Sequence, residues 1–531
     1  MSHEMADLTP AASDERSTTS NLDKEKTGVV QTAAVLDAQD AVSVHSEGGR
    51  SIHIPKRMRI LAVLLVSAIG FGSHWSSGVT GAMKSTLKKE LHINNTQYAL
   101  LDGSTDFMTT CLILFTGLLT DRLGGASTML WGNGIYSVGA ILIAAATTAR
   151  SYRFMIFGFI VQALGDISTQ VAQYKVFSTW FAPSNGFAST LGLELGLGKI
   201  GSFVGQATAN VIAKKTGDFS WVYWTAVFMN LFTNVATLVF FYFRQWCDAR
   251  YSGTTDPATG EKLSERNRKF DLKDLIRLPW TFWGFVAFSA FETSTAIVFS
   301  GNATELAEQR FDISDIAAGW YTSMSQYIGF FLVPCLGVFI DVFGNRLLVM
   351  VVCGSGVFVA MCLCAFGPSI SGTAASFGVY AFAYSLGPTV IVDGLRTAIA
   401  SQDTFGAAYA VKIAVNNAMN IIVRIVTGVI QDRDDNSYSH VVIVYVILAA
   451  GSVVVSLTLL TLSFFKVELA VLQWTRKHRV RDGETVAKAK AAAGGGDLNR
   501  KISLVLFGGL VCLILGSWAA YFWGVATGHN D

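Results

Sequence analysis

Polar side chains recur at helical spacing inside stretches that are otherwise apolar. In residues 406–430, four of them follow one another at four-residue steps, namely Lys412, Asn416, Asn420 and Arg424. They would form a stripe along one side of a helix, and their ammonium, amide and guanidinium groups suit the binding of a polar or anionic group. Asn416 and Asn420 are the stronger binding candidates, because the two basic side chains lie near the ends of the stretch and can reach toward water.

A second polar group lies in residues 154–181. Asp166, Gln170 and Gln173 are separated by four and then three residues, which places them near one face of a helix. One such face can line a cavity, so Asp166 and Gln173 are candidate binding residues. The alternative for Asp166 is a hydrogen bond that holds neighbouring helices together.

Further ionisable groups stand in apolar surroundings, where they are costly unless they meet a partner or a wet cavity. Lys199 could bind an anionic group of a ligand or pair with Glu194. Glu292 could supply a counter-charge or carry a proton. His74 and Trp75 could form a titratable and stacking pair, or they could pack or anchor a helix at an interface.

Asp102 and Asp106 occupy one further apolar stretch. They could hold an amino group, exchange protons or pack against polar neighbours, and the residues alone leave these alternatives open.

Covalent chemistry has little support in this chain. It lacks a Gly-rich phosphate loop ending in Lys-Ser/Thr, a Gly-x-Ser-x-Gly motif and a His/Cys cluster with metal-ligand spacing. The formal net charge is +2, and no basic tract with interleaved aromatic residues is present. We therefore expect a protein that is not an enzyme, with no cofactor, no metal and no nucleic-acid partner.

The elements that position these residues are predicted to be membrane-spanning helices. Of the 531 residues, 51% are hydrophobic and 15% are charged, which is too apolar for a surface in water. Apolar runs of about 20 residues, enough to cross a hydrocarbon core of about 30 Å, recur along the chain. Twelve spans are expected at 60–82, 98–119, 127–147, 154–181, 187–213, 219–243, 280–302, 317–340, 346–367, 373–398, 406–430 and 440–465.

Basic segments divide these spans into two sets of six. Lys and Arg are frequent just before the first span, between the sixth and seventh, and after the twelfth, and such segments stay in the cytosol. We expect an all-α polytopic membrane protein of two pseudo-symmetric six-helix bundles. Its predicted parts are a disordered cytosolic tail (1–55), the first bundle (56–243), a cytosolic linker (244–279), the second bundle (280–466), a basic cytosolic segment (467–501) and a thirteenth span (502–525), for which a membrane-surface helix is the alternative.

The strongest local pattern is a repeat of Gly-x-x-x-Asp-x-x-Gly after the second and the eighth span. Glycine lets a neighbouring helix approach closely, and an aspartate at a helix end can bond free N–H groups of another helix or pair with a basic residue. Two copies at equivalent places are expected of a protein built from two related bundles. We expect the repeat to latch one conformation through Gly117, Asp121, Arg122, Gly337, Asp341 and Arg346.

This duplicated motif resembles the signature of the major facilitator superfamily. Stretches in both halves resemble its lysosomal dipeptide-transporter branch, the family of major facilitator domain-containing protein 1: residues 93–101, 171–173, 180–181, 192–202, 406–409 and 416–417. The resemblance implies transport of a small polar solute by alternating access, with dipeptides or amino-acid-like compounds carried by uniport or together with protons. Organic anions or sugars are alternative solutes, and a transport-inactive receptor or accessory subunit is an alternative function.

The resemblance also bears on single residues and on location. Lys199 stands where the branch carries an arginine that binds the substrate carboxylate, and a glutamate of the branch aligns with Ile167, beside Asp166. The branch has an acidic residue where this chain reads Ser76-Ser77-Gly78 and aromatic residues where this chain has residues 102–106, so the pocket is expected to differ. The family implies a lysosomal or vacuolar membrane, with the plasma membrane as the alternative. Its implied partners are a small-molecule substrate, the lipid bilayer and an accessory membrane subunit.

Overall fold

The computed structural model describes residues 54–251, 254–258, 262–263, 277–367, 369–401 and 404–527. The predicted tail, apart from its last two residues, and parts of the predicted linker lie outside these ranges. The chain divides into a large unit, residues 55–246 and 253–531, and a small unit, residues 1–54 and 247–252. In the small unit the backbone N–H of Tyr251 donates to the carbonyl of Cys247 at 2.9 Å.

The first bundle has six long helical spans. They are α2 (Lys56–Ile69) continued by α3 (Phe71–Ala82), α5 (Asn95–Leu123), α6 (Gly125–Thr148), α7 (Tyr152–Trp180), α8 (Phe187–Thr216) and α9 (Ser220–Arg250), with the short helix α4 (Lys84–Leu91) after the first span. Local chemistry sets their ends. The Asn94 side chain accepts from the Gln97 backbone N–H at 2.7 Å and the Gln97 side chain accepts from the Asn94 N–H at 3.0 Å, a reciprocal cap that starts α5.

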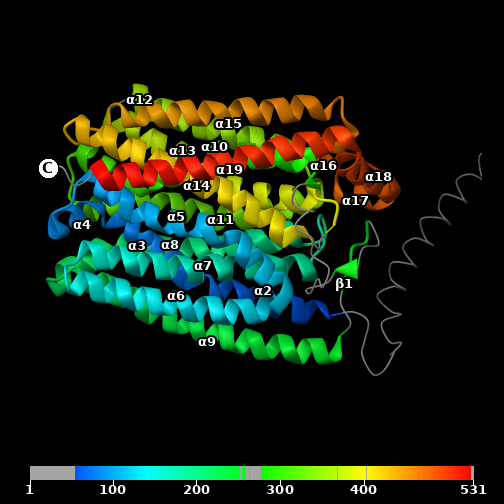
Figure 1. Ribbon diagram of the computed structural model, residues 1–531, viewed down its shortest axis with the longest axis horizontal. Helices are drawn as coiled ribbons and strands as arrows, with labels where there is room; N and C mark the ends of the chain where they lie inside the picture. Colours follow the sequence, from blue (N-terminus) through cyan, green and yellow to red (C-terminus); the bar gives the residue numbers. More distant parts are fainter. Residues whose placement is uncertain are drawn as a thin grey trace, which may run out of the picture. The chain divides into compact units, whose positions relative to one another are not determined.

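The second bundle repeats this arrangement with α10 (Trp280–Phe311), α11 (Asp315–Phe343), α12 (Arg346–Phe366), α13 (Ile370–Ala398), α14 (Phe405–Arg433) and α15 (Val441–Ser463). Each bundle has its own apolar core, around Trp75 and Phe159 in the first and around Phe299 and Tyr380 in the second. The bundles meet chiefly along two helix pairs, α5 with α14 and α8 with α11 (Figure 1).

Length and composition identify eleven helices of the described chain as able to cross a membrane. The spans α5 and α8 are not among them, although they have 29 and 30 residues, because charged residues stand in their middles. Polar groups at membrane depth face a bundle interior or a wet cavity. Large apolar side chains are exposed on the outer helices, among them Trp131, Phe228 and Phe366, as expected for a lipid-facing surface. The protein is a multi-pass membrane protein.

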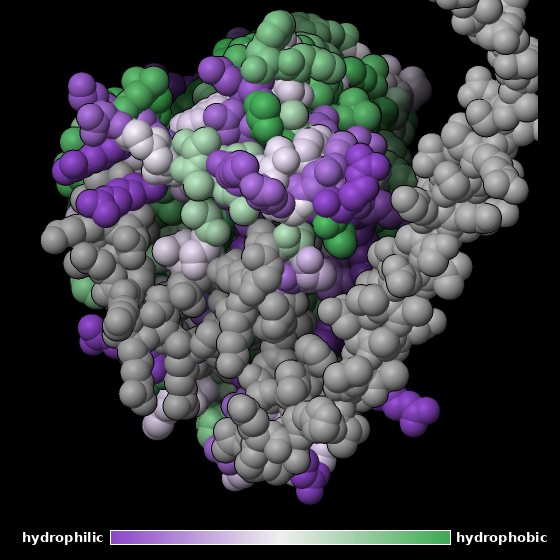
Figure 2. Space-filling model, turned by 90° about the vertical axis from the view of Figure 1, so that its right-hand side faces the viewer, coloured by the Kyte–Doolittle hydropathy of each residue, from purple (hydrophilic) through white to green (hydrophobic). Residues whose placement is uncertain are grey.

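The chain after the twelfth span is helical. Three short helices, α16 (Val467–Gln473), α17 (Arg476–Arg481) and α18 (Gly483–Gly494), lead to α19 (Gly496–Thr527), which is long and apolar enough to cross a membrane. α19 lies against α14 and α5 and runs beside them in Figure 1. We refer to the end of the bundles that carries α16–α18 as the cytosolic end, following the distribution of basic residues. Hydrophilic side chains gather on that face in Figure 2.

All twelve predicted spans correspond to helices, and the predicted fold class is confirmed. The largest difference is in α10, which continues past the predicted end at residue 302 to Phe311. Hydropathy predicted the earlier end because Glu305 and Glu308 follow. The helix tolerates Glu305 because its two carboxylate oxygens lie 2.8 and 2.7 Å from the ammonium groups of Lys84 and Lys88. A short antiparallel pair of strands, β1 (Thr254–Thr255) and β2 (Lys262–Leu263), lies between α9 and α10.

Candidate functional site

A cavity of about 490 Å³ lies between the two bundles. Helices α3, α5, α7 and α8 form one wall, and α10, α11, α13 and α14 form the other. Its volume falls in the range of about 300–1,000 Å³ that is usual for small-molecule sites. The predicted site residues that line it are His74, Asp102, Asp106, Asp166, Gln173, Lys199, Asn416 and Asn420.

A carboxylate of α8 is held in the first-bundle wall by two predicted residues. One oxygen of Glu194 accepts from the Gln173 side-chain amide at 3.1 Å and lies 3.7 Å from His74 Nε2. Gln173 also donates to the carbonyl of Val66 at 3.2 Å, which fixes its orientation. The second oxygen of Glu194 has no hydrogen-bond partner among the described residues, although the side chain is buried. A buried polar atom without a partner is costly, so a donor group of a ligand that reached this oxygen would be stabilised there.

Two ammonium groups line the same cavity. Lys199 Nζ lies 4.5 Å from the ring centre of Tyr384, a residue of the opposite bundle, and Lys412 Nζ lies 5.8 Å from that of Tyr409. An aromatic face attracts a cation without neutralising it. Both groups therefore remain able to bind an anion in the cavity. Gly329 of α11 makes room for Lys199, because a Cβ atom there would lie 3.2 Å from the lysine stem.

The remaining polar lining residues differ in how firmly they are held. Asn416 donates to the Ser289 hydroxyl at 2.9 Å and is tied to α10. The side-chain oxygen of Asn420 has no hydrogen-bond partner in the described part of the chain. Asp166 lies on the wall opposite α14, near His74. Asn420 also hydrogen-bonds Asp106, and Asp166 hydrogen-bonds Ser73, so each of these groups has a partner in the wall.

Two predicted binding residues do not line the cavity. Trp75 is 5% exposed and packs in the apolar core of the first bundle. Glu292 is completely buried, accepts from the Thr293 hydroxyl at 2.9 Å and lies 3.7 Å from the Cys353 sulfur. Glu292 sits behind the wall rather than on it, since its helical phase points it toward α12 and α13.

The second copy of the repeated motif joins the bundles at the cytosolic end. Asp341 accepts from the backbone N–H and the hydroxyl of Ser189, at 2.7 and 2.5 Å, at the start of α8. Arg346 is fully buried, pairs with Asp393 at 2.5 Å and donates to the Ser184 hydroxyl of the first bundle at 3.0 Å. We call Ser184, Ser189, Asp341, Arg346 and Asp393 the cytosolic latch. The sequence motif predicts the bond between Asp341 and the start of another helix. It does not predict the pairing of Arg346 with Asp393, because Asp393 lies outside the motif.

The first copy of the motif is not equivalent in this structure. Arg122 is exposed, and the side chain of Asp121 lies outside what the structure describes. Gly117 faces α14 more loosely than Gly337 faces α8. An added Cβ at Gly117 would lie 3.3 Å from the Ala410 methyl group, whereas one at Gly337 would lie 2.4 Å from the Ala188 carbonyl oxygen.

A second set of contacts joins the bundles at the opposite, outer end. Lys84 and Lys88 of α4 pair with Glu305 of α10. At the start of α5, the backbone N–H groups of Asn95 and Thr96 donate to the two carboxylate oxygens of Asp432 at 3.0 and 2.9 Å. We call Lys84, Lys88, Asn95, Thr96, Glu305 and Asp432 the outer latch. The residue patterns did not predict it, because charges at span ends are equally consistent with contact with water.

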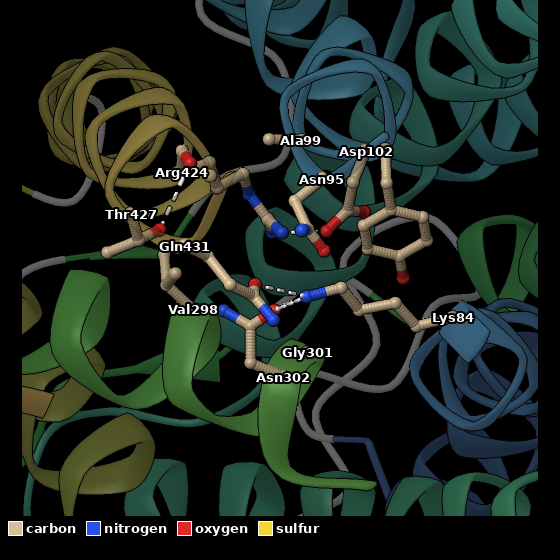
Figure 3. A pocket seen from close by; sticks show the side chains of 12 residues that line it. Lys84, Asn95, Ala99, Asp102, Val298, Gly301, Asn302, Arg424, Thr427 and Gln431 are labelled. Atoms are coloured by element: carbon tan, nitrogen blue, oxygen red, sulfur yellow. Dashed lines mark hydrogen bonds and ion pairs between the residues drawn. The ribbon is translucent and has the colours of Figure 1, made fainter. Parts of the chain in front are cut away.

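A small polar pocket separates the outer latch from the central cavity. Lys84, Asn302 and Gln431 point into it from the outer side, and Asp102 and Arg424 form its inner side (Figure 3). Its volume is about 20 Å³. The structure therefore holds contacts between the bundles at both ends of the cavity.

This arrangement of two bundles around one cavity agrees with the comparison with known families. Residues 66–404, more than half of the chain, match the Major Facilitator Superfamily. The chain belongs to this superfamily. It is therefore a membrane transporter by family.

Individual relatives within the superfamily carry one name. Lysosomal dipeptide transporter MFSD1 of Homo sapiens is 23% identical over 392 residues, which cover 71% of this chain and 81% of that protein. The Mus musculus protein of the same name is 23% identical over 415 residues, covering 75% and 85%. The Danio rerio protein is 28% identical over 169 residues, covering 31% and 34%.

Gly117 and Gly337 differ in how closely the neighbouring helix approaches them, so substitution by alanine should have a larger effect at Gly337. Gly337→Ala should force α11 away from α8 and weaken the cytosolic latch, because the added methyl group meets backbone rather than a movable side chain. We expect a cysteine placed at Ser189 to be labelled at least about tenfold faster by a membrane-impermeant reagent in Gly337→Ala, a change of about 1.4 kcal/mol in the closed–open equilibrium.

Gly117→Ala is the matched control, since its methyl group would lie 3.3 Å from the Ala410 methyl group and no nearer than 3.6 Å to backbone atoms of α14. Labelling of the same cysteine should change less than threefold. Equal labelling of both variants would contradict the assignment of a tight contact to the second copy alone.

Proposed function

We propose that this facilitator carries small zwitterionic solutes of the dipeptide or amino-acid class. The observation that supports this most directly is the charge distribution in the cavity. An unpaired carboxylate oxygen of Glu194 and the carboxylate of Asp166 offer acceptors for an amino group. Lys199 and Lys412 offer donors for a carboxylate in the same cavity.

A zwitterion satisfies both sets of groups at once, which matters because buried charges are costly when unpaired. A sugar would leave both sets without a counter-charge. An organic anion would satisfy the ammonium groups alone. The relatives named as lysosomal dipeptide transporters agree with this choice of solute, and their location supports a lysosomal or vacuolar membrane for this protein.

The two latches support transport by alternating access. The cytosolic and outer latches lie on opposite sides of the cavity, and opening each in turn exposes the same site to opposite sides of the membrane. Solute binding contributes by its different affinity for the open and closed states. Lys199, which faces Tyr384 across the bundle interface, is placed to sense that closure.

The first experiment is a thermal stability screen of the purified protein, since a ligand bound only by the folded state raises the apparent stability. A dipeptide is compared with its N-acetylated and C-amidated derivatives, with sugars and with organic acids, and hits are tested for uptake into liposomes. We expect the free dipeptide to stabilise most and each capped derivative less. Stabilisation by a sugar or an organic acid alone would refute the zwitterion, and binding without uptake would indicate a receptor.

A substitution of Glu194 tests the amino-group end separately. Glu194→Gln keeps the side-chain shape but removes the charge, so the dipeptide affinity should fall about 10- to 100-fold, as is typical for a lost charged hydrogen bond of about 1.5–3 kcal/mol. The affinity for the N-acetylated derivative, measured by isothermal titration, should be nearly unchanged. Equal losses for both ligands would contradict the assigned role.

A further inference from the structure

The helix α19 is additional to the two six-helix bundles and contacts both of them. It lies against α14 and α10 of the second bundle and against α5 of the first. Only 17% of its most apolar stretch is buried, and large apolar side chains such as Leu504, Val505 and Leu515 are exposed along it. α19 therefore holds to the bundles through a narrow strip and belongs to the apolar core of neither bundle.

The cytosolic half of α19 is fixed to the second bundle. The side-chain oxygen of Asn499 accepts from the backbone N–H of Trp280 at 2.9 Å, and the hydroxyl of Ser503 accepts from Trp283 Nε1 at 3.1 Å. Both tryptophans lie at the start of α10, and Asn499 and Ser503 are buried. Such hydrogen bonds persist in a membrane because no water is present to replace them. We therefore expect α19 to move with the second bundle.

The outer half of α19 also contacts α5 of the first bundle. The ring of Phe107 on α5 is stacked on that of Tyr521, with ring centres 4.6 Å apart and an interplanar angle of 17°. The same ring lies 5.8 Å from Trp518 and 5.6 Å from Phe522. These distances are typical of favourable aromatic pairs. Phe107 is thus enclosed by three rings of a helix that is attached to the opposite bundle.

Nearer the outer end, α19, α5 and α14 come together at Gly524. A Cβ atom there would lie 3.2 Å from Leu100 of α5 and 3.4 Å from Ile425 of α14. Leu100, Ile425 and Tyr521 belong to one buried apolar cluster. Lipid tails are as apolar as these side chains, so close packing and ring geometry stabilise this contact rather than escape from water. That stabilisation is lost when the helices separate.

This three-helix contact lies close to the outer latch. The latch bonds the start of α5 to Asp432 near the end of α14, and Leu100 lies about one turn further along α5. Opening of the outer side must draw the start of α5 away from the end of α14. Because α19 stays with α10 and α14, the same movement takes Leu100 and Phe107 away from α19. Opening of the cytosolic side separates the other ends of these helices and leaves the contact in place.

We propose that α19 is a clamp that moves with the second bundle and holds α5 of the first, which favours closure of the outer side. The inference goes beyond the proposed function, because it concerns the balance between conformations and holds for any class of solute. On the other helix pair between the bundles, α8 with α11, the aromatic side chains Trp320 and Tyr327 contact Phe203 and are exposed. The clamp therefore acts on the pair of α5 with α14.

The first test measures opening of the outer side without any solute. A cysteine replaces Gly81, which lines the cavity close to Lys84 of the outer latch and has room for a Cβ atom. A membrane-impermeant maleimide is added on the outer side of liposomes that contain the full-length protein, and the protein without this cysteine gives the background. Phe107→Ala and Tyr521→Ala should each speed labelling about three- to tenfold, as expected for the loss of favourable aromatic pairs. The double variant should label no faster than Phe107→Ala alone.

Two further variants control this measurement. Trp523→Ala removes an exposed ring of the same helix that makes no ring contact with α5 among the described residues, and it should change labelling less than about twofold, since no aromatic pair is lost. Phe107→Tyr retains the ring and should label at the wild-type rate. That result would separate loss of the ring contact from a folding defect in Phe107→Ala.

A second test determines which bundle α19 follows. Cysteines in place of Leu100 and Gly524, joined by a short cleavable bifunctional thiol reagent, tie α19 to α5. This link should stop exchange of labelled for unlabelled dipeptide across the liposome membrane, and cleavage of the reagent should restore it. Cysteines in place of Ile425 and Gly524 tie α19 to α14 and are the matched control. Exchange should continue with that link, because the two helices move together.

The outcomes separate this inference from the proposed function. Unchanged labelling in Phe107→Ala, or an equal increase in Trp523→Ala, would overturn the clamp. Exchange that continues when α19 is tied to α5 would also overturn it, since α19 would then follow the first bundle. Absence of dipeptide exchange by the unlinked wild-type protein would overturn the proposed function alone, and the labelling rates would still decide whether α19 is a clamp.

Discussion

Lys199→Ala is expected to lower the dipeptide affinity of this facilitator by about 10- to 100-fold. The substitution removes an ammonium group that lines the cavity and lies over the ring of Tyr384. A hydrogen bond to a charged group contributes about 1.5–3 kcal/mol, which corresponds to this loss. The half-saturating concentration for uptake into liposomes measures the effect. Binding of the C-amidated dipeptide should change little, because it lacks the carboxylate.

Two further variants control this result. Lys215→Ala removes an exposed lysine near the end of the same helix and should leave uptake unchanged. Lys199→Arg retains the positive charge but changes its shape, so it should retain part of the affinity. An unchanged half-saturating concentration in Lys199→Ala would remove this residue from the site without affecting the fold.

Arg346→Ala should have the largest effect on stability, a loss of about 3–5 kcal/mol in the free energy of unfolding. Arg346 and Asp393 are both fully buried and lie 2.5 Å apart, so the variant removes the directly bonded counter-charge of a buried carboxylate. The charge of the buried Arg479 still acts on Asp393, but these two groups do not form an ion pair in the described part of the chain. Chemical denaturation of the purified protein, or its melting temperature in one detergent, would measure the change. The cytosolic latch should also open more readily, since Arg346 reaches Ser184 of the first bundle.

The matched comparison separates loss of the pair from loss of an arginine. The double variant Arg346→Met/Asp393→Leu removes both charges and should regain much of the stability. Arg476→Ala removes an exposed arginine that donates to Asn185, and it should cost less than about 1 kcal/mol. A cost for Arg346→Ala no larger than that for Arg476→Ala would show that the buried pair does not stabilise the fold.

Some residues of the cavity and the latches could be predicted from residue patterns, and others could not. The four-residue stripe in α14 predicted that Asn416 and Asn420 line the interior, and both do. The repeated motif predicted the bond of Asp341 to the start of α8, but it did not predict that Arg346 pairs with Asp393 of α13. The same reasoning placed Trp75 in the site, but Trp75 packs in the core. A tryptophan in an apolar helix can lie either in the cavity wall or in the apolar core, so the residue type alone cannot distinguish these two locations.

Glu194 shows the opposite error. The residue types indicate Glu194 only as a structural partner of Lys199, whereas in the structure it lies between Gln173 and His74 and one of its carboxylate oxygens has no partner among the described residues. No residue pattern indicates a role for Tyr384 or Lys84. Their roles depend on residues of the other bundle, more than 180 positions away in the chain, and no local pattern records such a pairing.

The sequence alone determined the number, order and approximate limits of the spans, because a hydrocarbon layer requires about 20 apolar residues for each crossing and tolerates few charges. It also determined the duplicated half, because the motif repeats at equivalent places. Only the tertiary structure decided which polar residues share the cavity, which form the two latches and which remain behind the wall. Hydropathy indicates that a polar side chain does not face lipid. Which residues that side chain contacts depends on the rotation of each helix about its axis and on the pairing of α5 with α14 and of α8 with α11.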